Sequence, residues 1–142
     1  MTVASVVGEG TLGNGVYAEG TGGVSVTSGT IDVQRSGIVA IGLNDSDVAI
    51  ETSGDTITET NHAIYGSGGN VSVVTAEGTI TRGGTSGIRA VASDSAAIVN
   101  GGTAVATGDL GSAIHVTAPG EVSIASEAVQ VTGPGADPGV RA

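Results

Sequence analysis

The stretch Ala63-Ile64-Tyr65-Gly66-Ser67-Gly68-Gly69-Asn70-Val71-Ser72-Val73 joins two apolar segments through a glycine-rich turn. It opens with a four-residue phrase: a small residue, Ile or Val, any residue, and a further residue that is usually small. Six copies of this phrase occur, at Gly15-Val16-Tyr17-Ala18, Gly37-Ile38-Val39-Ala40, Ala63-Ile64-Tyr65-Gly66, Gly87-Ile88-Arg89-Ala90, Ala113-Ile114-His115-Val116 and Gly139-Val140-Arg141-Ala142. Their Ile or Val positions are 22, 26, 24, 26 and 26 residues apart. Such a period indicates a repeat architecture.

Each repeat contains two further short strands. The second strand ends in an apolar residue, at Val26, Ile50, Val73, Ile98 and Ile124. The third strand centres on an apolar residue seven positions later, at Val33, Ile57, Ile80, Val105 and Val131. Alternation of apolar and small polar residues in the second strand is typical of a strand with one buried face. Gly, Asn, Asp and Ser lie between the strands, where tight turns need them.

Three strands in each repeat predict an all-β fold, a three-sided parallel β-helix in which stacked coils lie about 4.8 Å apart. We expect one domain, residues 1–142, of about five coils of 22–26 residues, starting near residues 15, 37, 63, 87, 113 and 139. The Ile and Val residues of each strand position should form buried ladders. Because the chain opens within a coil and closes on a first strand, we expect a segment of a longer array, truncated at both ends.

The composition narrows the classes of partner. The chain has 14 Asp and Glu residues against four Arg and no Lys, with a formal net charge of −10. Nucleic acid and anionic membranes both favour clustered positive charge, so we expect neither as a partner. No apolar run reaches the roughly 18 residues of a membrane span, and no signal peptide is visible after Met1. Cys is absent, which excludes disulfides and thiolate metal sites.

The repeated phrase, followed by a V-x-V strand and a Gly-Thr-Ile-x-Thr strand, resembles the passenger regions of bacterial autotransporters of the pertactin-like and adhesin types. The resemblance extends from about Ser5 to the end of the chain, and its degenerate motif marks an architecture rather than an activity. It implies a right-handed β-helix that is exported and displayed on the bacterial cell surface as an adhesin or a stalk. The segment Val39-Ala40-Ile41-Gly42 also resembles the head repeats of trimeric autotransporter adhesins, a left-handed β-roll, but those repeats are shorter than the spacing here.

Candidate chemical sites are few, so we expect no enzyme activity, no cofactor and no metal. Asp45 and Asp47 lie in an oxygen-rich turn that could hold a divalent cation weakly, but we interpret it as a solvated turn. His62 and His115 lie two coils apart, about 10 Å along the axis, too far to share one metal. The repeated Thr-x-Thr segments of ice-binding solenoids occur here in two coils only, which is too few for a regular lattice.

The outward position of the phrase is the strongest candidate for a binding surface. In stacked coils it forms a row, here named the outward stripe, which consists of Tyr17, Val39, Tyr65, Arg89, His115 and Arg141. Tyr and Arg are favoured at binding hot spots. We therefore predict a structural or adhesive segment at the bacterial surface that binds a host or neighbouring-cell protein or glycan. The alternative is a self-assembling fibre element, because the end coils of a solenoid present unpaired strand edges.

Overall fold

The computed structural model describes residues 2–7, 13–109, 111–133 and 139–142, with the backbone alone for residues 2–7. All its regular structure is β-strand, in two parallel sheets that wind into a solenoid of about five turns. The fold class predicted from the repeat is therefore confirmed. Among the described residues, no helix is long and apolar enough to cross a membrane.

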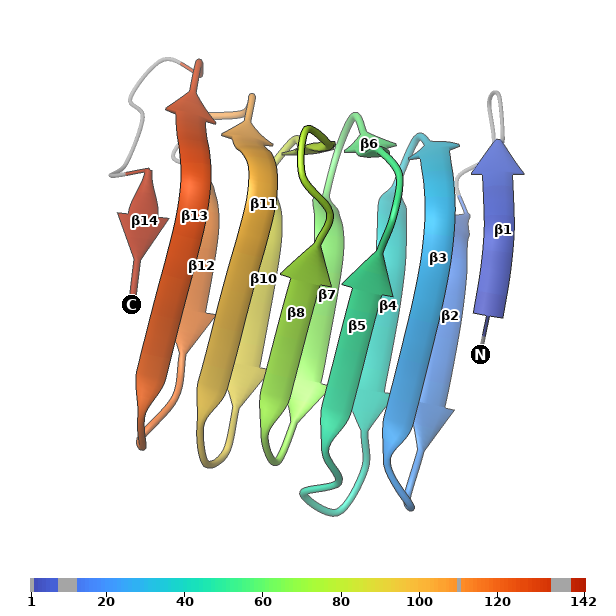
Figure 1. Ribbon diagram of the computed structural model, residues 1–142, viewed down its shortest axis with the longest axis vertical. Helices are drawn as coiled ribbons and strands as arrows, with labels where there is room; N and C mark the ends of the chain where they lie inside the picture. Colours follow the sequence, from blue (N-terminus) through green and yellow to red (C-terminus); the bar gives the residue numbers. More distant parts are fainter. Residues whose placement is uncertain (1, 8–12, 110, 134–138) are drawn as a thin grey trace.

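The two sheets form two layers (Figure 1). The back layer contains the strands of the recurring phrase: β2 (Asn14–Gly20), β4 (Ser36–Gly42), β7 (His62–Gly68), β10 (Ser86–Ala92), β12 (Ser112–Thr117) and β14 (Val140–Arg141). The front layer contains β1 (Thr2–Val7), β3 (Val24–Val33), β5 (Val48–Thr52), β8 (Val71–Thr75), β11 (Ala96–Ala106) and β13 (Val122–Val131). Two short strands, β6 (Thr56–Thr58) and β9 (Ile80–Gly83), continue β5 and β8 beyond a corner and supply the third strand of their coils.

The coil is right-handed. In Figure 1 the front strands run upward, the back strands run downward, and each new coil lies to the left of the one before it. This is the hand that a right-twisted strand favours when the chain crosses over to a parallel neighbour. The three strand positions in each coil agree with the prediction, although the second and third share one bent sheet.

Apolar ladders from the first and second strands make the core. The phrase residues Val16, Ile38, Ile64, Ile88 and Ile114 lie in register and are buried. The second strands add the buried residues Val26, Ile50, Val73 and Ile98. Each such side chain contributes roughly 1.5–3 kcal/mol on burial. Because neighbouring coils supply these contacts, no coil is stable alone.

Of the predicted third ladder, Val33 and Val105 are buried, but Ile57 and Ile80 are not. Asp32 pairs with Ile57, and Ile57 pairs with Arg82, so this row points outward. Ile80 is 42% exposed. The inward positions belong instead to three buried threonines, Thr56, Thr58 and Thr81. An outward Thr array of the ice-binding kind is therefore absent from these coils.

A corner of variable length explains the error. The aligned inward residues Ile31, Thr56, Thr81 and Ala104 follow the last buried apolar residue of the second strand (Val26, Ile50, Val73 and Ile98) by 5, 6, 8 and 6 positions. A constant offset of seven residues therefore selects an inward side chain in some coils and an outward one in others. Since side chains alternate along a strand, a one-residue slip moves a residue to the opposite face.

A polar row lies at this corner. Its members are Ser28, Thr52, Thr75, Asn100 and Ser126, which pair in register through successive coils. The first four are buried, and Ser126 is half-buried. Asn100 is 2% exposed and accepts a hydrogen bond from Thr75 Oγ1 at 2.7 Å. Its Nδ2 donates to Gly102 O at 2.7 Å and to Ser126 Oγ at 2.8 Å. The side chains of Thr75, Asn100 and Ser126 thus join three coils at the point where the chain bends between strands. Ser28 Oγ and Thr52 Oγ1 in the same row are buried without a hydrogen-bond partner.

We expect Thr81→Val to leave the free energy of unfolding unchanged or to raise it by up to about 1 kcal/mol. Thr81 Oγ1 is buried without a hydrogen-bond partner, and Val preserves the shape of Thr. The control is Thr75→Val, which removes the bond to Asn100 and should cost about 1–2 kcal/mol. Urea unfolding of both variants measures the difference. If Thr81→Val lowered the free energy of unfolding as much as Thr75→Val does, the Thr81 hydroxyl would have to make a hydrogen bond.

Candidate functional site

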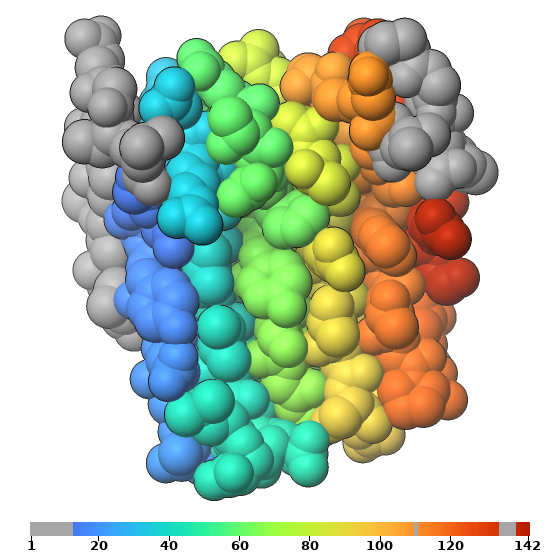
Figure 2. Space-filling view, turned by 180° about the vertical axis from the view of Figure 1, so that it is seen from behind, coloured from blue at the N-terminus to red at the C-terminus, as the bar shows by residue number. Residues whose placement is uncertain are grey.

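The outward stripe lies on the outer face of the back layer, the face seen in Figure 2. Consecutive members pair directly between neighbouring strands: Tyr17 with Val39, Val39 with Tyr65, Tyr65 with Arg89, Arg89 with His115, and His115 with Arg141. At about 4.8 Å per strand the row extends for roughly 24 Å. The structure therefore brings all six predicted residues into one row, and their role in binding stays a prediction.

The stripe changes character along its length. Its first half is aromatic and apolar, and Tyr17 is 50% exposed. Its second half is basic, with two of the four Arg residues and one of the two His residues of an acidic chain. The phenol of Tyr17 donates a hydrogen bond to Glu19, which raises the pKa of Tyr17. An aromatic segment beside cationic groups can contact a partner through both apolar and charged groups.

His62 lies beside the stripe. Its ring stacks on Tyr65 with the ring centroids 5.8 Å apart and an angle of 22° between the planes. Burial lowers the pKa of His62 to about 4, helped by the positive charges of Arg89 and His115. His62 is therefore neutral at pH 7, and its Nδ1 is buried without a partner.

The free energy of unfolding should depend on the protonation of His62. The unfolded chain binds a proton near pH 6.5, whereas folded His62 binds one only near pH 4. The contribution of neutral His62 to the free energy of unfolding is thus fully present above pH 6.5 and declines as the pH falls toward 4. Allowing for partial solvent exposure, we expect this decline to amount to roughly 1 kcal/mol. The measurement is urea unfolding at several pH values for the natural protein and His62→Gln. Parallel pH curves for the two proteins would contradict it.

The two acidic residues considered as a cation site have separate partners. Ser93 Oγ donates to Asp45 Oδ1 at 2.7 Å. Asp47 Oδ1 accepts bonds from the backbone N of Asn70 at 3.1 Å and from its Nδ2 at 2.9 Å. Within the described ranges, no group of three His, Cys, Asp or Glu side chains could hold a metal ion. Asp45 and Asp47 therefore serve the stacking of coils.

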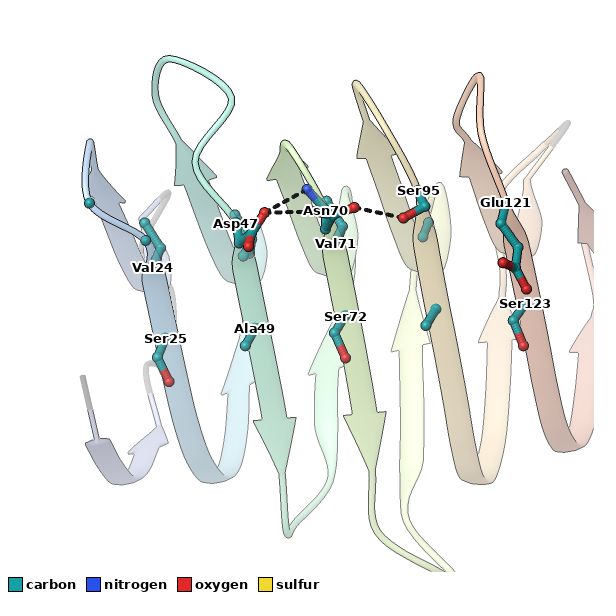
Figure 3. A pocket seen from close by; sticks show the side chains of 15 residues that line it. Val24, Ser25, Asp47, Ala49, Asn70, Val71, Ser72, Ser95, Glu121 and Ser123 are labelled. Atoms are coloured by element: carbon teal, nitrogen blue, oxygen red, sulfur yellow. Dashed lines mark hydrogen bonds between the residues drawn. The ribbon is translucent and has the colours of Figure 1, made fainter.

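A second surface is a groove on the outer face of the front layer, with a volume of about 730 Å³. Its floor is a register row of the smallest side chains, Ser25, Ala49, Ser72, Ala97 and Ser123. A polar ridge borders the floor where the chain enters these strands, and it consists of Asp47, Asn70, Ser95 and Glu121. Figure 3 shows the ridge and the floor at successive levels of the same strands. We call this surface the axial groove.

Hydrogen bonds between coils fix the ridge. Asn70 joins Asp47 in the preceding coil to Ser95 in the next, whose Oγ donates to Asn70 Oδ1 at 2.6 Å. The two bonds from Asn70 lower the pKa of Asp47. On the opposite side of the floor lies a register row that includes Glu51, Val74 and Val99, all of them exposed, Val74 and Val99 at 37% and 50%. The groove is thus bounded by a polar row and a partly apolar row.

No family model, curated protein or solved structure matches this chain. Proposals about its function therefore rest on the solenoid and on its two surfaces.

The axial groove was not predicted, although the sequence contains a trace of it. The middle residue of the second strand is Ser or Ala in every coil, as in Val24-Ser25-Val26 and Val48-Ala49-Ile50. A small residue at an exposed strand position is common and by itself does not predict a groove. Only the alignment of five coils shows that these residues form a continuous floor between taller side chains.

Proposed function

We propose that this chain is a structural and adhesive segment of a protein displayed on a bacterial cell surface, similar to an autotransporter passenger region. The outward stripe carries the proposal, because it aligns Tyr17, Tyr65, Arg89 and other large side chains on a rigid wall. Its partner is a protein or glycan of a host or neighbouring cell. The net charge of −10 argues against nucleic acid and anionic lipid.

The architecture suits a scaffold. Parallel strand pairing runs through every coil, so the wall cannot bend locally without breaking ladder hydrogen bonds and opening the apolar core. Stable presentation of side chains at fixed spacing lowers the entropy cost of binding. The expected absence of enzyme activity and of a cofactor remains a prediction.

Protease treatment of intact source cells tests the location. Peptides of this chain released without lysis, and identified by mass spectrometry, would support display at the cell surface. Their absence, while known surface proteins of the same cells are cleaved, would contradict it.

The double variant Tyr17→Ser/Arg89→Ser tests the stripe. We expect beads coated with it to lose binding to target cells at least about tenfold relative to the natural protein, since Tyr and Arg carry much of the energy of typical interfaces. The matched control is Ile80→Ser/Arg82→Ser, which removes an exposed apolar side chain and an exposed Arg side chain from the third strand β9, outside both surfaces. Equal binding by the two double variants would mean that the stripe is not the contact surface.

End-to-end assembly is the second candidate, and the state of β13 favours it. Among the described strands, β13 pairs only with β11. Its inward residues Val122 and Ile124 are half-buried, whereas the equivalent Ala96 and Ile98 of β11 are buried. Another strand could pair with this edge. Light scattering over a dilution series should show concentration-dependent growth that Val129→Lys suppresses, and one constant mass would exclude assembly.

A further inference from the structure

The geometry of the axial groove points to a binding site for a linear, uncharged glycan that lies along the solenoid axis. The groove crosses β3, β5, β8, β11 and β13, on the layer opposite the outward stripe. The inference therefore concerns a different surface from the proposed adhesive one. It holds whether or not the protein is displayed on a cell.

The shape of the groove selects an elongated ligand. Five strands at about 4.8 Å spacing give a floor roughly 19 Å long. Every floor residue is Ser or Ala, so nothing blocks the path across the coils, while the ridge and the exposed side chains of Val74 and Val99 stand on either side. The side chains of Val24, Val48 and Val71 point into the core and are buried, so the apolar contacts beside the floor come from the exposed Val74 and Val99. These two side chains can contact the C–H faces of sugar rings.

The hydrogen-bonding groups of the groove suit a polyol. Carboxylates at Asp47 and Glu121 accept bonds, the amide of Asn70 both donates and accepts, and hydroxyls such as Ser72 and Ser123 do the same. Sugar hydroxyls are likewise both donors and acceptors, so they can use every one of these groups. The bonds from Asn70 to Asp47 and from Ser95 to Asn70 hold the ridge in place before a ligand arrives, which lowers the entropy cost of binding.

Charge separates this ligand from its alternatives. The lining contains the carboxylates of Asp47 and Glu121 and no Arg, Lys or His, and the row that borders the floor adds Glu51, in a chain of net charge −10. An anionic glycan would be repelled. A cationic peptide would use acceptors alone, and these carboxylates are exposed to solvent, where each ion pair contributes about 0–1 kcal/mol. An uncharged chain uses the donors, the acceptors and the exposed side chains of Val74 and Val99 together.

The test is an NMR titration of the ¹⁵N-labelled full chain with three uncharged hexasaccharides of glucose, linked β-1,4, α-1,4 and β-1,3. Hexagalacturonate and hexalysine are the charged comparators. We expect at least one glucan to bind with a millimolar dissociation constant, because no aromatic platform is present in the lining. Its first shifts should fall on the amides of the floor row, and binding should change little between about 50 mM and about 500 mM salt.

Two groove variants and one control make the result specific. Ala97→Gln fills the exposed floor without changing charge, and Asn70→Ala removes the central ridge residue. Each should weaken glucan binding about tenfold, whereas Thr117→Gln, exposed on the back layer, should leave it unchanged. Failure of all three glucans to bind, tighter binding of either charged comparator, or unaltered binding by Ala97→Gln would overturn the inference. The stripe variant Tyr17→Ser/Arg89→Ser should bind the glucan as the natural protein does. The proposals for the two surfaces can therefore be refuted independently.

Discussion

Asn100→Ala is expected to lower the free energy of unfolding by roughly 2–4 kcal/mol. Asn100 joins three coils at the corner of the solenoid, where it accepts from Thr75 and donates to Gly102 O and Ser126 Oγ. Ala removes these bonds and leaves the Thr75 hydroxyl and the Gly102 carbonyl without their partner in a buried place. An unmet buried polar group costs more than the same bond contributes at the surface.

Asn70→Ala is the matched control, because Asn70 likewise joins three coils through its side chain but is exposed. Its loss should cost at most about 1 kcal/mol, since water replaces the missing partners. Asn100→Asp adds a second check, since it keeps the shape and replaces the amide donors with a carboxylate that faces the Gly102 carbonyl. Asn100→Asp should lower the free energy of unfolding at least as much as Asn100→Ala does. Chemical unfolding measures all three, and similar losses at positions 70 and 100 would refute the role of burial.

The features predicted correctly from the sequence are those that repeat at a fixed offset from the phrase. Ile38, Ile64 and Ile88 recur in one strand with constant neighbours, and the structure pairs them in register. The stripe follows from the same alignment, because the residue after each Ile must point to the opposite face. Within one strand, local alternation alone fixes which side chains are buried.

Features beyond a corner of variable length could not be predicted in this way. Ile57 and Ile80 are apolar yet lie outward, because the corner before them lengthens and the phase of alternation changes. The hydrogen bonds of Asn100 join residues of three coils, so no local sequence pattern predicts them. The axial groove likewise depends on register between coils. Contacts across the stack, rather than along the chain, determine these features.

The small first residue of the phrase has its explanation in the same cross-stack packing. At Gly37 an added Cβ would lie 2.5 Å from the carbonyl O of Ala63 and 2.5 Å from Thr56 Cγ2. The first of these atoms belongs to the backbone of the next coil, and the second belongs to β6, the third strand of the coil that Gly37 begins. The phrase therefore requires a small residue because the first and third strands meet there, and the composition of the repeat follows from the shape of the coil.

Gly37→Ala should accordingly reduce the free energy of unfolding by about 2–3 kcal/mol, through overpacking rather than backbone strain. Gly13→Ala is the control, because a Cβ there meets no atom within 4 Å, and it should be neutral within about 0.5 kcal/mol. The double variant Gly37→Ala/Thr56→Ser removes the methyl group in conflict and should recover part of the loss. Recovery must stay incomplete, since the Ala63 carbonyl cannot be removed. Thermal and urea unfolding measure each step, and a neutral Gly37→Ala would show that neighbouring coils can separate enough to admit a methyl group.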